Sequence, residues 1–241
     1  MVTQLKLQKI YQIKGKIKLL TGLHIGSGNT EMHIGGVDNL VVKHPYTNEP
    51  YIPGSSLKGK IRSLLEYLYG LPVYSENNGG ITSHKILTNN KIPKEVKEKA
   101  EIILRLFGLS GAGEDILKII GPTRVAFADC FLDENYIKKL KDENLPFTEI
   151  KAENRINRIT GTAEHPRFIE RVPAGAEFKF QVTLKIYQPE DEQLLNILLT
   201  GMKLLELDYL GGSGSRGYGR IKFEFEDKQF TEKFENIQPF E

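Results

Sequence analysis

Alternating apolar and polar positions predict two long strands in this chain. In residues 10–20, Ile13, Ile17 and Leu19 alternate with three lysines, Lys14, Lys16 and Lys18. In residues 178–186 every second position is apolar and the positions between are polar. Side chains of a strand point to opposite faces in turn, so each segment has one buried and one exposed face. The exposed face of the first strand is basic.

Apolar residues recurring at helical spacing predict three helices. These cover residues 55–69, 94–107 and 190–206. Ser55 or Ser56 is the expected N-cap of the first helix, and Gly108 is well placed to end the second. Further strands are expected at 123–132 and, ending the chain, at Ile221–Phe225. Residues 150–173 are expected to form two extended arms around a turn near Gly161.

This order of elements predicts one α+β domain of ferredoxin-like type over residues 1–241. The strands and helices alternate in the ferredoxin-like manner once three insertions are set aside. The insertions are a long Gly/Pro-rich loop at about 21–54, a helical segment at about 70–122 and the hairpin at about 150–173. A loop as long as the first is usually functional in a compact domain.

Charge and composition narrow the function classes. The 33 basic and 31 acidic residues give a net charge of +2, which by itself argues against a strongly basic nucleic-acid binder. The charge is segregated, however: residues 1–62 hold nine basic and three acidic residues, +6, and the remainder carries −4. The single cysteine, Cys130, excludes a disulfide framework and fits a reducing cytoplasm. No signal-peptide pattern and no apolar run of ~18 residues is present, so we expect a cytoplasmic protein that avoids membranes.

The glycine-rich segment 210–220 is a candidate phosphate-binding loop. Gly212, Gly214 and Gly217 match G-x-G-x-x-G, but a helix precedes and a strand follows, the reverse of a dinucleotide-binding fold. Arg216 and Arg220 lie in it with no acidic residue between positions 209 and 223. Glycines let backbone N–H groups approach an anion, and arginine grips phosphate, so we favour phosphate binding over a flexible connector.

The start of the first helix is a second candidate anion site. Lys58, Lys60 and Arg62 occupy its first turns, with no acidic residue before Glu66. The N-terminal end of a helix favours negative charge, so this placement is self-repulsive unless an anion binds there. The alternative is a solvated basic face.

The hairpin at 150–173 carries arginines between apolar residues. Arg155, Arg158, Arg167 and Arg171 alternate with isoleucine and phenylalanine. Such a surface suits stacking on single-stranded bases and contacts to their phosphates. An amphipathic hairpin packed on the domain's own core explains the pattern equally well.

The loop after the first strand holds the candidate catalytic groups. Gly26 follows the strand, His24 and His33 flank the loop, and Asp38 follows a Gly-Gly pair. Two histidines with one aspartate at this spacing are weak grounds for a metal site. Asp38 could act as a general base, a metal ligand or a hydrogen-bonded loop brace, and chemistry alone favours the brace.

Several segments together resemble one known family. They are TGLHIGSG, GGVD, YIPGSSLKGKIRSLLE, RLFG at 105–108, ENRINRITGTAEHPRFIERV and YLGGSGSRGYGRI, in this order between about residues 10 and 222. They resemble the backbone-subunit family of the type III-A CRISPR (Csm) interference complex, within the RAMP superfamily.

The resemblance implies a modified ferredoxin-like (RRM-type) fold with a lid and a thumb hairpin. It implies copies stacked head-to-tail along a guide crRNA, beside other Csm-complex subunits, in antiviral defence. It further implies a metal-dependent endoribonuclease, with a divalent ion expected as Mg²⁺, that cuts target RNA at regular six-nucleotide intervals. Asp38 matches the family's cleavage carboxylate. His24, Lys58, Lys60 and Arg62 match its guide-RNA contacts, and the loop around Arg216 lies beside them.

Gly26, Arg155, Arg158, Arg167 and Arg220 complete the expected RNA-binding set, and the +6 of residues 1–62 would line the RNA groove. Asp38 would orient or deprotonate the attacking 2′-hydroxyl, or hold the metal, and both roles stay open. Two other functions compete: a stand-alone RAMP endoribonuclease that processes precursor guide RNA through His24 or His33, and a non-catalytic structural backbone subunit.

Overall fold

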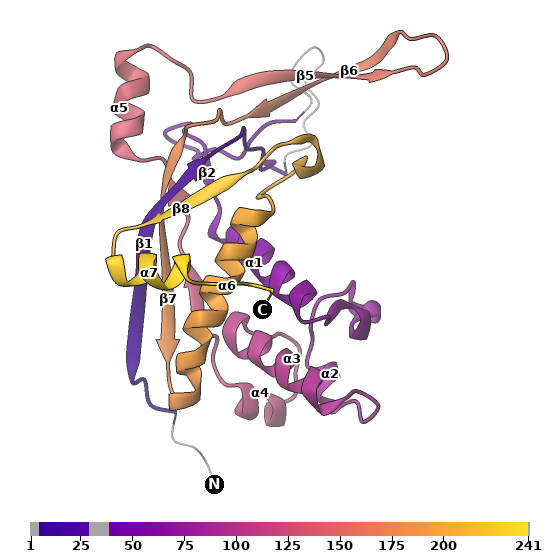
Figure 1. Ribbon diagram of the computed structural model, residues 1–241, viewed down its shortest axis with the longest axis vertical. Helices are drawn as coiled ribbons and strands as arrows, with labels where there is room; N and C mark the ends of the chain where they lie inside the picture. Colours follow the sequence, from indigo (N-terminus) through magenta and orange to yellow (C-terminus); the bar gives the residue numbers. More distant parts are fainter. Residues whose placement is uncertain (1–4, 29–38, 241) are drawn as a thin grey trace.

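A four-stranded antiparallel sheet forms the centre of the protein. The computed structural model describes residues 5–28 and 39–240. The sheet contains β1 (Lys9–Leu19), β3 (Val125–Phe127), β7 (Glu177–Ile186) and β8 (Ile221–Phe225), in the order β3-β7-β1-β8. The helix α1 (Gly54–Leu68) follows β1 and α6 (Gln193–Leu207) follows β7 (Figure 1). This β-α-β-β-α-β order confirms the ferredoxin-like α+β fold.

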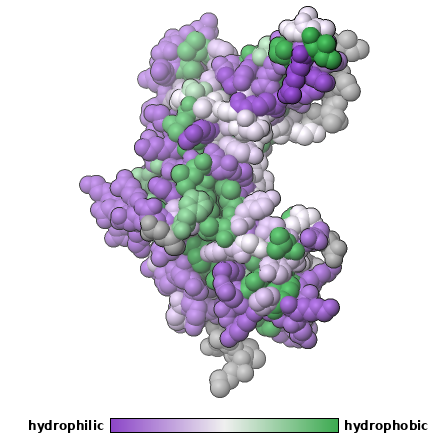
Figure 2. All heavy atoms as spheres, turned by 45° about the vertical axis from the view of Figure 1, so that its right-hand side comes forward, coloured by the Kyte–Doolittle hydropathy of each residue, from purple (hydrophilic) through white to green (hydrophobic). Residues whose placement is uncertain are grey.

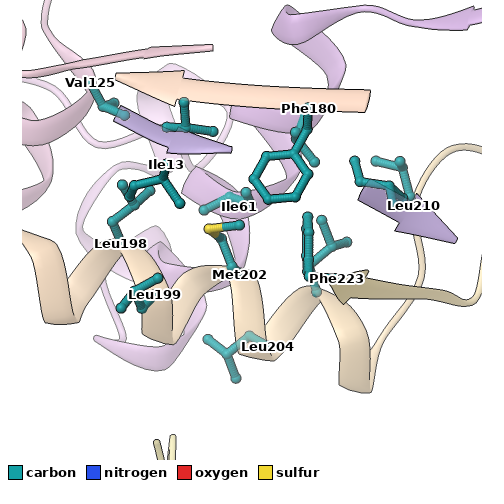
Figure 3. Packing of buried hydrophobic residues seen from close by; sticks show 14 of the residues in the cluster. Ile13, Ile61, Val125, Phe180, Leu198, Leu199, Met202, Leu204, Leu210 and Phe223 are labelled. Atoms are coloured by element: carbon teal, nitrogen blue, oxygen red, sulfur yellow. The ribbon is translucent and has the colours of Figure 1, made fainter. Parts of the chain in front are cut away.

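The core lies between one face of the sheet and the two helices. Ile13 on β1 is paired in register with Val182 on β7, and both are fully buried. In Figure 3, Ile61 of α1 and Met202 of α6 meet the sheet side chains from below. The two helices approach closely at Gly201, where a Cβ would lie 2.7 Å from Ile61 Cγ2. The alternation of apolar and polar residues in β1 and β7 therefore correctly predicts which face of each strand is buried.

The remaining elements are inserted between those of the core or follow them. They are β2 (Tyr51–Ile52), the 3₁₀ turns η1 (Pro72–Tyr74) and η2 (Glu76–Asn78), α2 (Lys85–Thr88), α3 (Lys94–Phe107), α4 (Glu114–Ile120), β4 (Cys130–Phe131), α5 (Glu134–Asp142), β5 (Glu149–Ile156), β6 (Ala163–Arg171), η3 (Pro189–Glu192), η4 (Gly214–Arg216) and α7 (Lys228–Glu235). The predicted helix at 94–107 is confirmed, and Gly108 caps it.

Three local predictions were wrong. Neither Ser55 nor Ser56 caps α1: its N-cap is Pro53, and Asp129, distant in sequence, accepts the Gly54 N–H at 2.7 Å. The expected strand 123–132 is divided into β3, which pairs with β7, and β4, which pairs with β2, before Leu132 bridges to β7 again at Phe178. The chain does not end in a strand, since α7 follows β8 and buries Phe230 and Phe234.

Across residues 5–28 and 39–240, no helix combines the length and apolar character needed to cross a membrane.

Candidate nucleic-acid interface

The hairpin of β5 and β6 projects from the body of the protein. Figure 1 shows it extending beyond the central sheet, and in Figure 2 the surface is hollowed beneath it. Ile156 is 57% exposed and Ile159, at the turn, is 96% exposed. The interpretation of a hairpin packed on its own core is therefore wrong for the outer part. Only the base of β6 enters the core, at Ile169 and Glu170.

The arginines of the hairpin point into solvent. Arg155, Arg158 and Arg167 are exposed, and within the described residues none of them has an ion pair or hydrogen bond from its side chain. Arg171, at the base, differs because its Nε donates to Glu149 Oε1 at 2.7 Å. The outer arginines are thus available to a polyanion, while Arg171 holds the two strands together.

Three basic residues at the start of α1 have three different environments. Lys58 has no acidic partner among the described residues; burial, and then the nearby Arg62, lowers its pKa. Lys60 Nζ lies 2.7 Å from Asp208 Oδ2, with which it forms an ion pair, and 4.0 Å from the ring centroid of Tyr209. The anion-site hypothesis therefore fits Lys58 best.

Arg62 is committed to internal contacts. Its Nε donates to Glu66 Oε1 at 2.9 Å and its Nη2 donates to the Thr82 carbonyl at 2.8 Å. Glu66 is buried, and it also accepts the Thr82 N–H. In this structure Arg62 therefore anchors the insertion after α1, in contrast to the RNA contact that the resemblance implies.

The glycine-rich loop between α6 and β8 is tightly packed. A Cβ on Gly214 would lie 2.1 Å from the Tyr209 ring, and one on Gly211 would lie 2.4 Å from the His24 carbonyl oxygen. The Gly212 N–H donates to that same carbonyl at 2.8 Å. These close approaches argue against a flexible connector, because glycine is required for contact rather than for motion. They also place the loop beside His24 and, through Tyr209, beside Lys60.

The two arginines of this loop differ. Arg220 is exposed, and its side chain makes no hydrogen bond or ion pair within the described part of the chain. Arg216 Nη1 donates to Glu153 Oε2 on β5 at 2.8 Å, and Nη2 donates to Ser213 Oγ at 2.6 Å. The stretch is acid-free in sequence, but the hairpin supplies an acidic partner in space.

His24 links the first loop to the base of the hairpin. Its Nδ1 lies 2.7 Å from the Glu170 carbonyl oxygen. A carbonyl only accepts, so Nδ1 carries a proton, and in the corresponding uncharged tautomer Nε2 is the acceptor. Gly26, exposed, pairs with Val41, and a Cβ there would lie 3.6 Å from His24 Nε2.

Glu170 is a central residue that the sequence analysis missed. Its carboxylate accepts from Lys43 Nζ at 2.5 Å, from Thr148 Oγ1 at 2.7 Å and from the Val41 N–H at 2.9 Å. Burial alone would raise its pKa, but these hydrogen bonds and the charge of Lys43 together lower it. Nothing in the local sequence marks Glu170, since the partners of its carboxylate come from two distant segments, 41–43 and Thr148.

Glu170 fixes the segment that follows residue 38. The Glu170 N–H donates to the Asn39 carbonyl, and Asn39 bridges to β6 at Ile169. The candidate catalytic residue Asp38 and the alternative His33 lie outside the described residues. Within residues 5–28 and 39–240 no group of three His, Cys, Asp or Glu side chains is arranged to hold a metal ion.

The chain belongs to the RAMP superfamily, whose family model matches residues 16–222. Within that superfamily it is a member of the Csm3 family. It is 43% identical to the CRISPR system Cms endoribonuclease Csm3 of Methanocaldococcus jannaschii, over 88% of this chain and 77% of that protein. It is 39% identical to the protein of the same name from Streptococcus thermophilus, over 88% of this chain and 86% of that protein.

Solved structures agree with this assignment. A chain in the crystal structure of a Csm3–Csm4 subcomplex of the type III-A CRISPR-Cas interference complex is 30% identical, with a TM-score of 0.51 over 95% of this chain and 85% of that chain. The crystal structure of Methanopyrus kandleri Csm3 has a TM-score of 0.58 at 24% identity, over 90% of this chain and 75% of that chain, and supports the fold. The family suggested by the sequence motifs is confirmed.

Proposed function

We propose that this chain is an RNA-binding backbone subunit of a type III-A CRISPR interference complex and an endoribonuclease that cleaves target RNA. Relatives about 40% identical carry the name endoribonuclease Csm3, and a structural relative comes from a Csm3–Csm4 subcomplex. The observation on this chain that carries the proposal is a group of basic side chains on α1, the hairpin and the glycine-rich loop that have no acidic partner among the described residues. These are Lys58, Arg155, Arg158, Arg167 and Arg220.

The guide crRNA is proposed to bind at the joined first loop, α1 start and glycine-rich loop. His24, Lys58 and Arg220 offer an acceptor and two cations there, and Gly26 exposes backbone beside His24. A cation without an acidic partner contributes most to RNA affinity, because it can contact a phosphate without first breaking an ion pair. Each such contact also releases counterions from the RNA. Lys60 would first have to leave Asp208.

The hairpin is proposed to act on the guide–target duplex. Ile156 and Ile159 expose apolar side chains, each directly after a cationic residue, Arg155 and Arg158. Apolar wedges inserted between base steps unstack them and kink a duplex, while neighbouring arginines hold the backbone. Successive copies stacked head-to-tail would repeat this kink at the regular six-nucleotide interval.

Asp38 is proposed as the cleavage carboxylate. At a kink, the 2′-hydroxyl of an unstacked nucleotide can reach in-line geometry toward its phosphate, which regular A-form RNA does not allow. Asp38 would orient or deprotonate that hydroxyl, giving a 2′,3′-cyclic phosphate, and the Glu170 network would hold the chain directly after it.

A divalent ion, expected as Mg²⁺, would neutralise charge on the phosphate. The described residues alone offer no three-ligand site. Mg²⁺ commonly binds through one or two carboxylates with water and substrate phosphate, so Asp38 with the RNA is the fitting ligand set.

The test compares wild-type protein with Asp38→Ala and Asp38→Asn, each assembled with guide RNA and the other Csm subunits. We expect both variants to bind target RNA normally and to lose cleavage, and chelation of divalent ions to stop cleavage by the wild type. Normal cleavage by Asp38→Ala would overturn the assignment of this residue. If the wild-type complex cleaved target RNA at the full rate in the presence of a chelator, the proposed metal dependence would be wrong.

The state of assembly of the protein with RNA distinguishes the proposed function from its two alternatives. The chain has no tryptophan, so its absorbance at 280 nm is weak and bound RNA is evident from the 260/280 nm ratio in size-exclusion chromatography. A multimer on RNA supports the backbone role. Cleavage of hairpin RNA by the monomer without metal would instead support the stand-alone processing enzyme. RNA-bound multimers that never cut target would support the structural subunit.

A further inference from the structure

Arg216 joins the glycine-rich loop to the hairpin through a single carboxylate. Its guanidinium is 2.8 Å from Glu153 Oε2, and the two residues are 63 positions apart in sequence. The Arg216 side chain is 49% exposed, whereas that of Glu153 is 16% exposed. An incoming anion can therefore reach the arginine side of this ion pair much more easily than the carboxylate side.

Glu153 has two further partners that do not depend on Arg216. The Tyr218 hydroxyl donates to Glu153 Oε1 at 2.8 Å, and Lys151 Nζ lies 3.5 Å from the same oxygen. Tyr218 is fully buried, and Lys151 and Arg171 lie over its ring at 4.5 and 4.9 Å from the centroid. This site keeps the carboxylate hydrogen-bonded and neutralised when Arg216 moves away.

Arg216 also lies in a region suited to phosphate. Arg220 is exposed nearby in the same loop, and the loop contacts His24 through the Gly212 N–H. Burial would raise the pKa of Glu153, but Tyr218, Arg216 and Lys151 together lower it, so the carboxylate is ionised at neutral pH and competes as an anion. A guanidinium binds carboxylate and phosphate in the same geometry.

We propose that Glu153 is an internal competitor for RNA: it occupies Arg216 in the free subunit, and an RNA phosphate displaces it on binding. The exchange leaves Glu153 on Tyr218 and Lys151 and breaks the ion pair between the glycine-rich loop and the hairpin. RNA bound at the loop thus changes how the hairpin base is held. This inference rests on the proposed RNA-binding function and adds a regulation of that site.

The test measures binding of a labelled single-stranded RNA to the full-length protein. Glu153→Gln removes the competing charge and keeps a hydrogen-bonding side chain, so we expect about two- to fivefold tighter binding, the range for freeing a half-exposed ion pair. Tyr218→Phe removes the alternative partner of Glu153, so the carboxylate holds Arg216 more firmly and binding weakens. The two variants change the affinity in opposite directions, which general loosening of the hairpin does not do.

Arg216→Ala completes a double-mutant cycle. In the wild-type background its effect is reduced by the cost of leaving Glu153, and in the Glu153→Gln background it reports the whole phosphate contact. We expect the loss of affinity from Arg216→Ala to be larger in the second background. Equal losses in both backgrounds would overturn the exchange.

A matched control uses another ion pair. On α3, Lys99 Nζ forms an ion pair with Glu95 Oε1 at 2.7 Å. We expect Glu95→Gln to leave the RNA affinity unchanged. A similar gain in Glu95→Gln would show a general charge effect and overturn the exchange. Failure of the wild type to bind RNA would instead contradict the proposed function itself, so the two hypotheses fail separately.

Discussion

At the residue scale, the basic side chains of the interface fall into two groups. Lys43, Lys60, Arg62, Arg171 and Arg216 are each bound to a carboxylate. The second group, which includes Lys58 and Arg220, has no such partner within the described residues. Because a paired cation must give up its carboxylate to bind phosphate, the two groups contribute differently to stability and to RNA affinity.

Lys58 and Arg62, one turn apart on α1, test this division. Lys58→Ala is expected to weaken RNA binding and to reduce the salt slope by about 1, with little change in stability. Arg62→Ala leaves the buried Glu66 carboxylate without its charge partner, and we expect a loss of about 3 kcal/mol in the free energy of unfolding. Urea unfolding and RNA titration of both variants check this. Unchanged affinity in Lys58→Ala would contradict it.

Glu170 gives a prediction about pH. Its pKa is lowered from an ordinary value of 4.5. A carboxylate with a lowered pKa stabilises the fold above the unfolded-state value, and this contribution disappears as the pH falls from about 4.5 through the folded-state value. Glu170→Gln lacks it and leaves Lys43 unpaired. We therefore expect Glu170→Gln to be less stable than wild type at neutral pH.

The measurement is urea unfolding of both proteins from pH 7 to pH 3. The difference between them should shrink below pH 4.5, where the wild type alone loses this contribution. A difference that stays constant over this range would show that the stability does not come from ionised Glu170.

At the scale of elements, the hairpin and the glycine-rich loop contrast in packing. The outer hairpin contributes nothing to the core, as the exposure of Ile156 and Ile159 demonstrates. The loop, by comparison, packs closely against the backbone of His24 and the side chains of Leu23 and Tyr209. Substitutions in the outer hairpin should therefore affect function, whereas substitutions of the packed glycines Gly211 and Gly214 should affect the fold first.

The prediction for the hairpin compares substitutions at exposed positions with a substitution at its buried base. The double variant Ile156→Ser, Ile159→Ser should change the unfolding free energy by less than about 0.5 kcal/mol, because both side chains are already in water. In the assembled complex it should reduce cleavage of target RNA. Ile169→Ser, at the buried base, should cost about 2 kcal/mol or more. Undiminished cleavage by the double variant would argue against a wedge.

Two glycines give opposite predictions for stability. A Cβ at Gly59 meets nothing within 4 Å, so Gly59→Ala should stabilise α1 by about 0.5–1 kcal/mol. A Cβ at Gly214 would lie 2.1 Å from the Tyr209 ring, so Gly214→Ala must displace that ring and the Lys60 beside it, lowering stability. Thermal unfolding of both variants measures the effects. If Gly214→Ala were more stable than wild type, the Tyr209 ring would be able to move aside at no cost, and this prediction would be wrong.

At the scale of the whole molecule, charge segregation is only partly explained by RNA binding. The +6 of residues 1–62 includes Lys14, Lys16 and Lys18, three of the four lysines of β1, which lie on the sheet face away from α1 and α6. Lys16 there pairs with Asp133 and Glu177. Lys16 is therefore already bound to two carboxylates, while the expectation that the charge of residues 1–62 lines an RNA groove stays a prediction for Lys14 and Lys18.

The salt dependence of RNA binding measures these cations together. If Lys58, Arg155, Arg158, Arg167 and Arg220 each contact one phosphate, the slope of log affinity against log salt is about −3.5 for a single strand, at about −0.7 per contact. Titrations between low and moderate salt determine the slope. A value near zero would mean that the unpaired arginines do not contact phosphate.

The sequence by itself determined the elements and the family. Apolar periodicity located β1, β7, α1, α3 and α6, because burial of one face is a local property of each segment. The motifs placed the chain in its family, and the order of the predicted strands and helices indicated the ferredoxin-like core. The hairpin was also predicted, but its pattern fitted both a packed and a projecting arrangement.

Only the tertiary structure decided which polar groups are paired. Asp129 caps α1 from 75 positions away, Glu153 binds Arg216 from 63, and Glu170 binds Lys43 from 127. Such partners meet when the whole chain has closed, and no local period encodes them. Arg216 therefore appears as an RNA ligand from the sequence, while the folded protein holds it with Glu153. Arg62 differs, because its partner Glu66 lies four residues on along the same helix, at a spacing that the sequence itself contains.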